Sequence, residues 1–178
     1  MPNRFAALSL ALLLPLPLPV LADGHVMGSL AGDIVSADGA QIGSVSVVET
    51  ASGVIQVIVQ ATGIEAGTHG VHLHETGVCE GDFSSAGGHI AGDAEHGLVA
   101  GGPHPGDLPN ANVGGDGELS YEAFAVAGLD LGEHLQDEDG SALIVHSGPD
   151  DYVSQPSGDS GDRVACAVLD AIPAAQEN

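Results

Sequence analysis

The sequence predicts an all-β protein, a flattened Greek-key barrel or sandwich of about eight antiparallel strands with long metal-binding loops. Three observations support this prediction: short runs of alternating apolar and polar residues, Asp-Gly pairs between several of those runs, and no convincing helical stretch. Period-two alternation is typical of strands that bury one face, and Asp-Gly pairs favour tight hairpin turns. A chain of 178 residues is expected to form one domain.

Each expected strand has this pattern in its own residues. The first is expected within residues 25–35. In residues 41–49, Val45 and Val47 share one face, and in residues 54–61, Ile55 and Val57 begin an apolar face. Asp-Gly turns are expected at 38–39, 116–117 and 139–140. The remaining strands are expected at residues 71–74, 118–125, 142–146 and 163–169.

Two segments interrupt the strand pattern. Residues 75–113 form a long glycine-rich stretch with three histidines, and residues 147–162 are short of apolar side chains. Long irregular loops inside a compact domain are usually functional or disordered. A loop without a core of its own needs another constraint, and metal ligation or a disulfide can supply it.

The charge of the chain excludes two classes of function. There are 25 Asp and Glu residues against only Arg4 and Arg163, which gives a formal net charge of −23. Neutralising nucleic-acid phosphates takes clustered Lys and Arg, and so does a polybasic attachment to a membrane surface. With 43% hydrophobic residues the chain also has enough apolar material for a core, so we do not expect it to be disordered.

The first 22 residues resemble a secretory signal peptide. Arg4 supplies the positive start, residues 5–14 form an apolar run of about the required length, and this run is too short to span a membrane. An uncleaved anchor is the alternative. Cleavage after Ala22 would leave residues 23–178 as one exported domain with no membrane attachment.

Cleavage at that point would expose Asp23-Gly24-His25 as a new amino terminus. Its amine, its amide nitrogens and the imidazole could bind Cu(II). The alternative is a frayed terminus with a solvated histidine.

Cys79 and Cys166 are the only cysteines. Disulfides persist in exported proteins, so we expect these two to be joined. Two buried free thiols are the alternative.

The histidines point to a metal site. His72 and His74 are two residues apart, so on a strand their rings lie on the same face while Val71 and Leu73 face the core. Imidazole is a good ligand for copper and zinc, and a carboxylate can complete a tetrahedral zinc site. Scattered surface histidines would be the alternative, but most of the remaining ones cluster in the sequence: His69, His89, His96, His104 and His146, with Asp107 nearby.

Four segments together resemble the motifs of the copper/zinc superoxide dismutase family, in the same order. They are GTHGVHLHE at 67–75, SAGGH at 85–89, HPGDLPN at 104–110 and GDRVAC at 161–166. The short 147–162 loop and the GDLPN sequence are similar to the bacterial exported branch. The resemblance extends from the first strand to Leu169.

This resemblance implies a role for each matching residue. His89 would bridge the two metals and take part in catalysis by carrying a proton, and Arg163 would hold the superoxide anion. Asp150 would accept hydrogen bonds from one histidine of each metal site, and His69 would brace the site without binding metal. The implied copper ligands are His72, His74, His89 and His146, and the implied zinc ligands are His89, His96, His104 and Asp107.

The resemblance also implies an activity, in which superoxide is converted to oxygen and hydrogen peroxide by a copper ion beside a structural zinc ion. It implies a periplasmic or otherwise exported protein that is a monomer or a homodimer. Two alternatives remain. A non-catalytic copper- or zinc-binding protein for storage or delivery could use the same ligands, whereas a structural zinc domain would need only His89, His96, His104 and Asp107 and would leave the other three histidines unexplained. Arg163 and the bridging His89 favour the enzyme, because storage requires neither.

Overall fold

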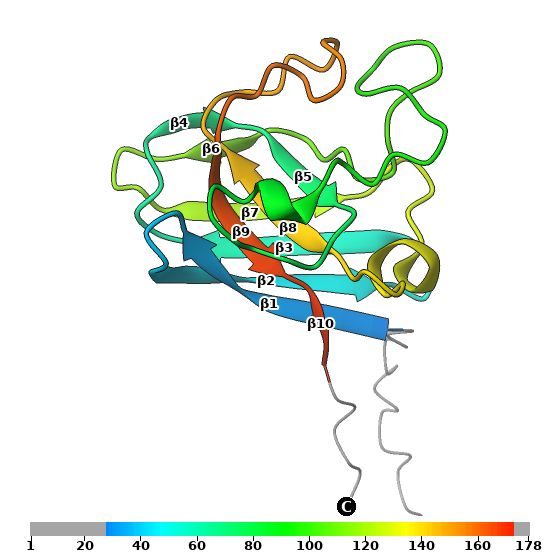
Figure 1. Cartoon of the computed structure of the whole chain (residues 1–178), viewed down its shortest axis with the longest axis horizontal. Coiled ribbons are helices and arrows are strands. Elements are labelled where there is room, and N and C mark those ends of the chain that lie inside the picture. Colours follow the sequence, from blue (N-terminus) through cyan, green and yellow to red (C-terminus); the bar gives the residue numbers. More distant parts are fainter. Residues whose placement is uncertain (1–27, 173–178) are drawn as a thin grey trace, which may run out of the picture.

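A curled antiparallel sheet forms most of the structure, and a small two-stranded sheet lies beside it (Figure 1). The computed structural model describes residues 28–172. The expected signal peptide at 1–22 and the Asp23-Gly24-His25 sequence lie outside the described residues.

The larger sheet contains eight of the described strands, and all of its pairings are antiparallel. Short β10 (Asp170–Ala171) pairs with β1. The order across the rest of the sheet is β5 (Val71–His74), β8 (Ala142–His146), β9 (Arg163–Val168), β1 (Gly28–Ser36), β2 (Gln41–Glu49), β3 (Ile55–Ala61) and β7 (Leu119–Phe124). The smaller sheet pairs β4 (Gly67–His69) with β6 (Ala111–Val113).

The predicted all-β class is confirmed, and every expected strand is present with its ends shifted by a few residues at most in the described part. The sequence did not reveal β4 and β6, because strands of three residues are too short to show an alternation. It also did not reveal a 3₁₀ turn at Ser84–Ala86 and a π-helical turn at Leu131–Leu135. Within residues 28–172, no helix is both long and apolar enough to cross a membrane.

Aliphatic side chains from alternate strand positions fill the interior. Val45 and Val47 are buried as expected, and so are the inward residues of β3 from Ile55 to Ala61. On β5, Val71 and Leu73 belong to this core, yet His72 and His74 on the opposite face are also fully buried. The strand is therefore covered on both sides, by the core on one side and by loops on the other.

The two long loops that cover this face lie together above the sheet (Figure 1). The amide of Leu98 in the first loop donates a hydrogen bond to the carbonyl of Tyr152 in the second (2.8 Å). The expected Cys79–Cys166 disulfide is present and joins the first loop to β9. In the second loop Gly158 has a positive φ, and a Cβ there would collide with Asp150 and His96. The loop can close over these side chains because this residue is glycine.

Candidate metal centre

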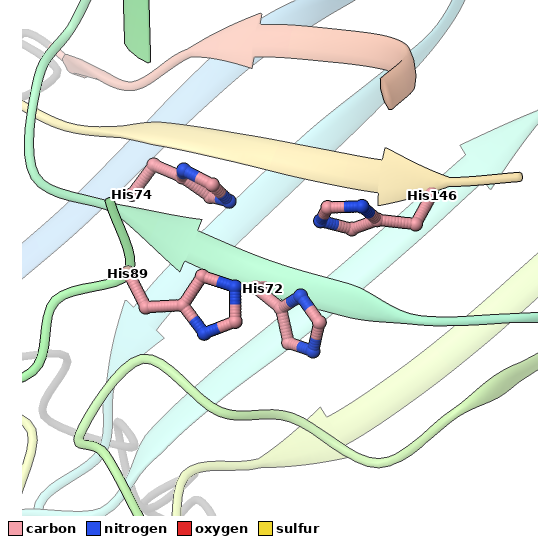
Figure 2. Close-up of side chains that lie close together, drawn as sticks. All are labelled: His72, His74, His89 and His146. Atoms are coloured by element: carbon pink, nitrogen blue, oxygen red, sulfur yellow. The ribbon is translucent and has the colours of Figure 1, made fainter. Parts of the chain in front are cut away.

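Eight donor positions form two adjoining buried groups. The four-histidine cluster consists of His72, His74, His89 and His146, whose rings point toward one another in Figure 2. The mixed cluster consists of His89, His96, His104 and Asp107. Within each cluster, one donor atom from every residue lies within 4.8 Å of the others. All the copper and zinc ligands that the resemblance implied are therefore brought together.

Strand geometry places the rings of the four-histidine cluster. His72 and His74 project from the same face of β5, and His146 ends the neighbouring β8. His89 comes from the first long loop and reaches His74 through an isolated antiparallel bridge. The face that the H-x-H spacing predicted is the one on which the cluster forms.

Hydrogen bonds on the outer nitrogens orient three of these rings. His74 Nδ1 donates to the Gly87 carbonyl (3.0 Å), and His146 Nδ1 donates to the Gly161 carbonyl (3.2 Å). His72 Nε2 donates to Asp150 Oδ2 (2.9 Å). A carbonyl or an ionised carboxylate only accepts, so each of these nitrogens carries the proton of its ring. The other nitrogen of each ring then presents a lone pair to the centre of the cluster.

The nitrogens that face the centre are buried and have no hydrogen-bond partner among residues 28–172. They are His72 Nδ1, His74 Nε2, His89 Nε2 and His146 Nε2, one from each ring of the cluster. Buried polar atoms are almost always paired, since leaving one unpaired costs about 1–3 kcal/mol. Four converging lone pairs fit a metal ion that prefers nitrogen ligands, as Cu(II) does.

In the mixed cluster three ring nitrogens surround a single carboxylate oxygen. Asp107 Oδ1 lies 2.9 Å from His89 Nδ1, 3.0 Å from His96 Nδ1 and 3.3 Å from His104 Nδ1. The other nitrogen of His96 faces Asp150 Oδ1 at 3.0 Å. A neutral imidazole has one N–H, so it can serve only one of these two carboxylates. A cation among the Nδ1 atoms and Asp107 removes this conflict, and three imidazoles with one carboxylate suit tetrahedral zinc.

His89 belongs to both clusters through its two different nitrogens. Nε2 lies in the four-histidine cluster and Nδ1 faces Asp107 in the mixed cluster. Its ring centre is 4.0 Å from that of His72 and 5.3 Å from that of His96. A single ring thus separates two sites suited to cations.

Asp150 connects the same two clusters from the outside. Oδ2 accepts from His72 and Oδ1 lies 3.0 Å from His96, which is the arrangement that the resemblance implied. Sequence reasoning assigned no role to Asn110, whose side chain exchanges two 2.8 Å hydrogen bonds with the Asp150 backbone. It also missed Gln155, whose amide makes two 2.8 Å hydrogen bonds with the His96 backbone. Of these two residues, only Asn110 belongs to one of the four segments that resemble family motifs, HPGDLPN at 104–110.

Burial keeps three histidines of the four-histidine cluster neutral and therefore able to bind metal. It lowers the pKa of His72 to about 4, of His146 to about 3 and of His74 to about 2. Burial opposes ionisation of Asp107, but hydrogen bonds, chiefly from His89 and the Gly97 amide, outweigh it and hold the pKa of that carboxyl below its usual range. At neutral pH these three rings are thus uncharged, and the Asp107 carboxyl is ionised.

Arg163 is held beside the four-histidine cluster by two backbone oxygens. Its guanidinium donates to the carbonyls of Phe83 (2.5 Å) and Gly87 (2.7 Å). The Gly87 carbonyl also accepts from His74, so one oxygen joins the arginine to a ring of the cluster. Arg163 is only partly buried, and it lines a surface hollow together with Asp82 and Asp162.

His69 belongs to neither cluster. Its ring nitrogens lie 2.7 Å from the His146 carbonyl and 2.8 Å from the Glu65 carbonyl. It contacts the backbone of a cluster residue and contributes no donor atom to either cluster, as the resemblance implied.

The sequence profile of the copper/zinc superoxide dismutases matches residues 41–169. The chain belongs to the copper/zinc superoxide dismutase family. The match runs from β2 to the end of β9 and contains every residue of both clusters.

Bacterial members of the superoxide dismutase family resemble the chain over most of its length. It is 37% identical to superoxide dismutase [Cu-Zn] 1 of Aquifex aeolicus over 77% of this chain and 85% of that protein. It is 38% identical to superoxide dismutase [Cu-Zn] of Caulobacter vibrioides, over 76% of this chain and 82% of that protein. The crystal structure of a SOD-like protein from Bacillus subtilis superposes with a TM-score of 0.71 at 35% identity, covering 78% of this chain and 97% of that one.

The lowered histidine pKa values predict how the metal-free superoxide dismutase responds to acid. A histidine in an unfolded chain titrates near pH 6.5. Between pH 7 and pH 5 the unfolded chain therefore binds protons that the buried rings of His72, His74 and His146 do not bind in the folded protein. The free energy of unfolding is therefore expected to decrease as the pH falls through this range. Urea denaturation of the metal-free protein at a series of pH values measures this free energy. A constant or increasing stability toward pH 5 would contradict the prediction, and His74→Gln should make the decrease smaller.

Proposed function

We propose that the four-histidine cluster binds copper, that the mixed cluster binds zinc, and that His89 bridges the two ions in an enzyme that dismutates superoxide. The observation that carries this proposal is the shared ring of His89, with one nitrogen in each cluster. A copper ion held by the four-histidine cluster would supply one-electron redox chemistry through its Cu(II) and Cu(I) states. Membership of the family supports copper and zinc as the cofactors.

Side chains of the protein supply the other functions that the proposed reaction needs: anion binding, proton transfer and orientation of the ligands. The Arg163 guanidinium supplies a positive charge beside the cluster and can hold an anion there through N–H groups. Nε2 of His89 has a lone pair that can take up a proton and give it up again, which suits a reaction that consumes two protons. Asp150 holds one ring of each cluster in a fixed orientation, through its contacts with His72 and His96.

A non-catalytic protein for metal storage or delivery could use the same ligands. The fixed guanidinium beside the cluster favours the enzyme, because storage gives no role to an anion-binding group at the copper position. Two relatives agree with this choice: the similar proteins of Aquifex aeolicus and Caulobacter vibrioides are named superoxide dismutases.

Replacing Arg163 tests the catalytic proposal. In the copper- and zinc-loaded protein, Arg163→Ala is expected to lower the rate constant for superoxide about 10- to 100-fold, because local attraction of the anion is lost. Pulse radiolysis measures this rate constant, and elemental analysis should find the metal content unchanged. The rate constant of Arg163→Lys, which keeps the charge, should lie between those of the wild type and Arg163→Ala. An Arg163→Ala protein as fast as the wild type would remove this residue from the mechanism.

Replacing Asp150 tests the proposed arrangement of the metal ligands. Asp150→Asn keeps the size of the side chain but can no longer accept from both His72 and His96, so metal affinity is expected to fall about 10- to 100-fold. Competition with a chelator for zinc and for copper measures the loss. Asp151→Asn is the matched control, because within residues 28–172 the Asp151 side chain bonds only to residues 153 and 154 of its own loop. Equal affinities for the two variants would contradict the proposal.

We also propose that the protein is exported after cleavage of residues 1–22. The Cys79–Cys166 disulfide supports this proposal, because such bonds persist in oxidising compartments. The intact mass of the protein purified from its own cells should correspond to a chain beginning at Asp23, in the exported fraction. A mass that includes Met1, or recovery from the cytosol alone, would refute it.

A further inference from the structure

The hollow at Arg163 contains opposing charges. Arg163, Asp82 and Asp162 line the same surface hollow, and both carboxylates are exposed. The full chain has no lysine and only one arginine besides Arg163. The sole cationic Lys or Arg side chain of the described residues thus shares its surroundings with two negative charges.

Asp82 is fixed in place by the same turn that holds Arg163. Phe83 has a left-handed backbone (φ 64°), and its carbonyl accepts a hydrogen bond from the guanidinium. One residue earlier, Asp82 Oδ1 accepts from the Ser84 amide at 3.1 Å. The turn that positions the arginine therefore also holds a carboxylate near it.

Asp82 does not neutralise the arginine by direct contact. No carboxylate of residues 28–172 lies within 4.0 Å of the Arg163 nitrogens. Hydrogen bonds from Ser84 lower the pKa of Asp82, with a smaller contribution from Arg163, so the carboxylate is charged at neutral pH. Its effect on an arriving anion is a repulsion through solvent, and salt screens such a repulsion.

We propose that Asp82 weakens the attraction of Arg163 for anions and thereby limits the rate at which superoxide is captured. The inference rests on the proposed role of Arg163. Asp82 need not touch the substrate, because it lowers the local positive potential that draws an anion toward the cluster. Removing its charge should therefore strengthen anion binding, and most at low ionic strength.

Azide is a suitable probe, because it is a monovalent anion whose binding to Cu(II) can be followed by absorption. In the copper- and zinc-loaded protein, Asp82→Asn is expected to lower the azide dissociation constant about twofold at about 10 mM ionic strength. The difference should shrink as the salt concentration rises toward about 0.15 M, where the Debye length is about 8 Å. The rate constant for superoxide should increase by a similar factor.

The substitutions are chosen to separate charge from structure. Asn keeps the oxygen that accepts from the Ser84 amide, so the turn is preserved, and Asp82→Glu keeps the charge and should behave like the wild type. Glu138→Gln is the matched control, because it removes one exposed negative charge that does not line the hollow. It should leave azide binding and its salt dependence nearly unchanged.

Two outcomes would overturn the proposal. If Asp82→Asn and Glu138→Gln change azide binding equally, or if neither changes it, Asp82 has no special effect. The Arg163→Ala protein distinguishes this failure from a failure of the proposed function. Weaker azide binding in Arg163→Ala would leave the arginine's role intact, whereas unchanged binding would remove both the role and the inference built on it.

Discussion

The site depends on one constraint: each buried ring of the four-histidine cluster other than His89 has its outer nitrogen hydrogen-bonded to an acceptor. Gly87, Gly161 and Asp150 are those acceptors, and they decide which nitrogen carries the proton. The free lone pairs are then forced toward a common centre. If these acceptors were absent, the same four side chains could rotate or change tautomer, and the cluster would lose its shape.

The fold supplies these acceptors from loops rather than from strands. β5 and β8 set the positions of three rings, but Gly87 lies in the first long loop, and Asp150 and Gly161 lie in the second. The loops in turn are held by the disulfide to β9 and by the hydrogen bond between Leu98 and Tyr152. The sheet therefore provides a rigid base, while the loops complete the site and bury it.

The strands and the pair His72 and His74 could be predicted from local patterns, whereas the other donor residues were predicted from the resemblance to family motifs. The H-x-H spacing of His72 and His74 fixes a shared face, and the alternation in β2 and β3 fixes the core. The supports of the site have no such pattern. The Gly87 and Gly161 carbonyls are backbone atoms that any sequence contains, and Gln155 meets His96 only after the two loops have folded together. Strands β4 and β6 were missed because three residues are too few to show an alternation.

The carbonyl of Gly87 has a consequence of its own. A carbonyl oxygen has two lone pairs, and here one atom accepts from both His74 and Arg163. The positions of the ring and the guanidinium are therefore coupled through one atom of the first long loop, although the two side chains belong to different strands, β5 and β9. A change in the course of the backbone at this point would therefore disturb the His74 ring and the Arg163 guanidinium together, and neither contact could be adjusted there without the other.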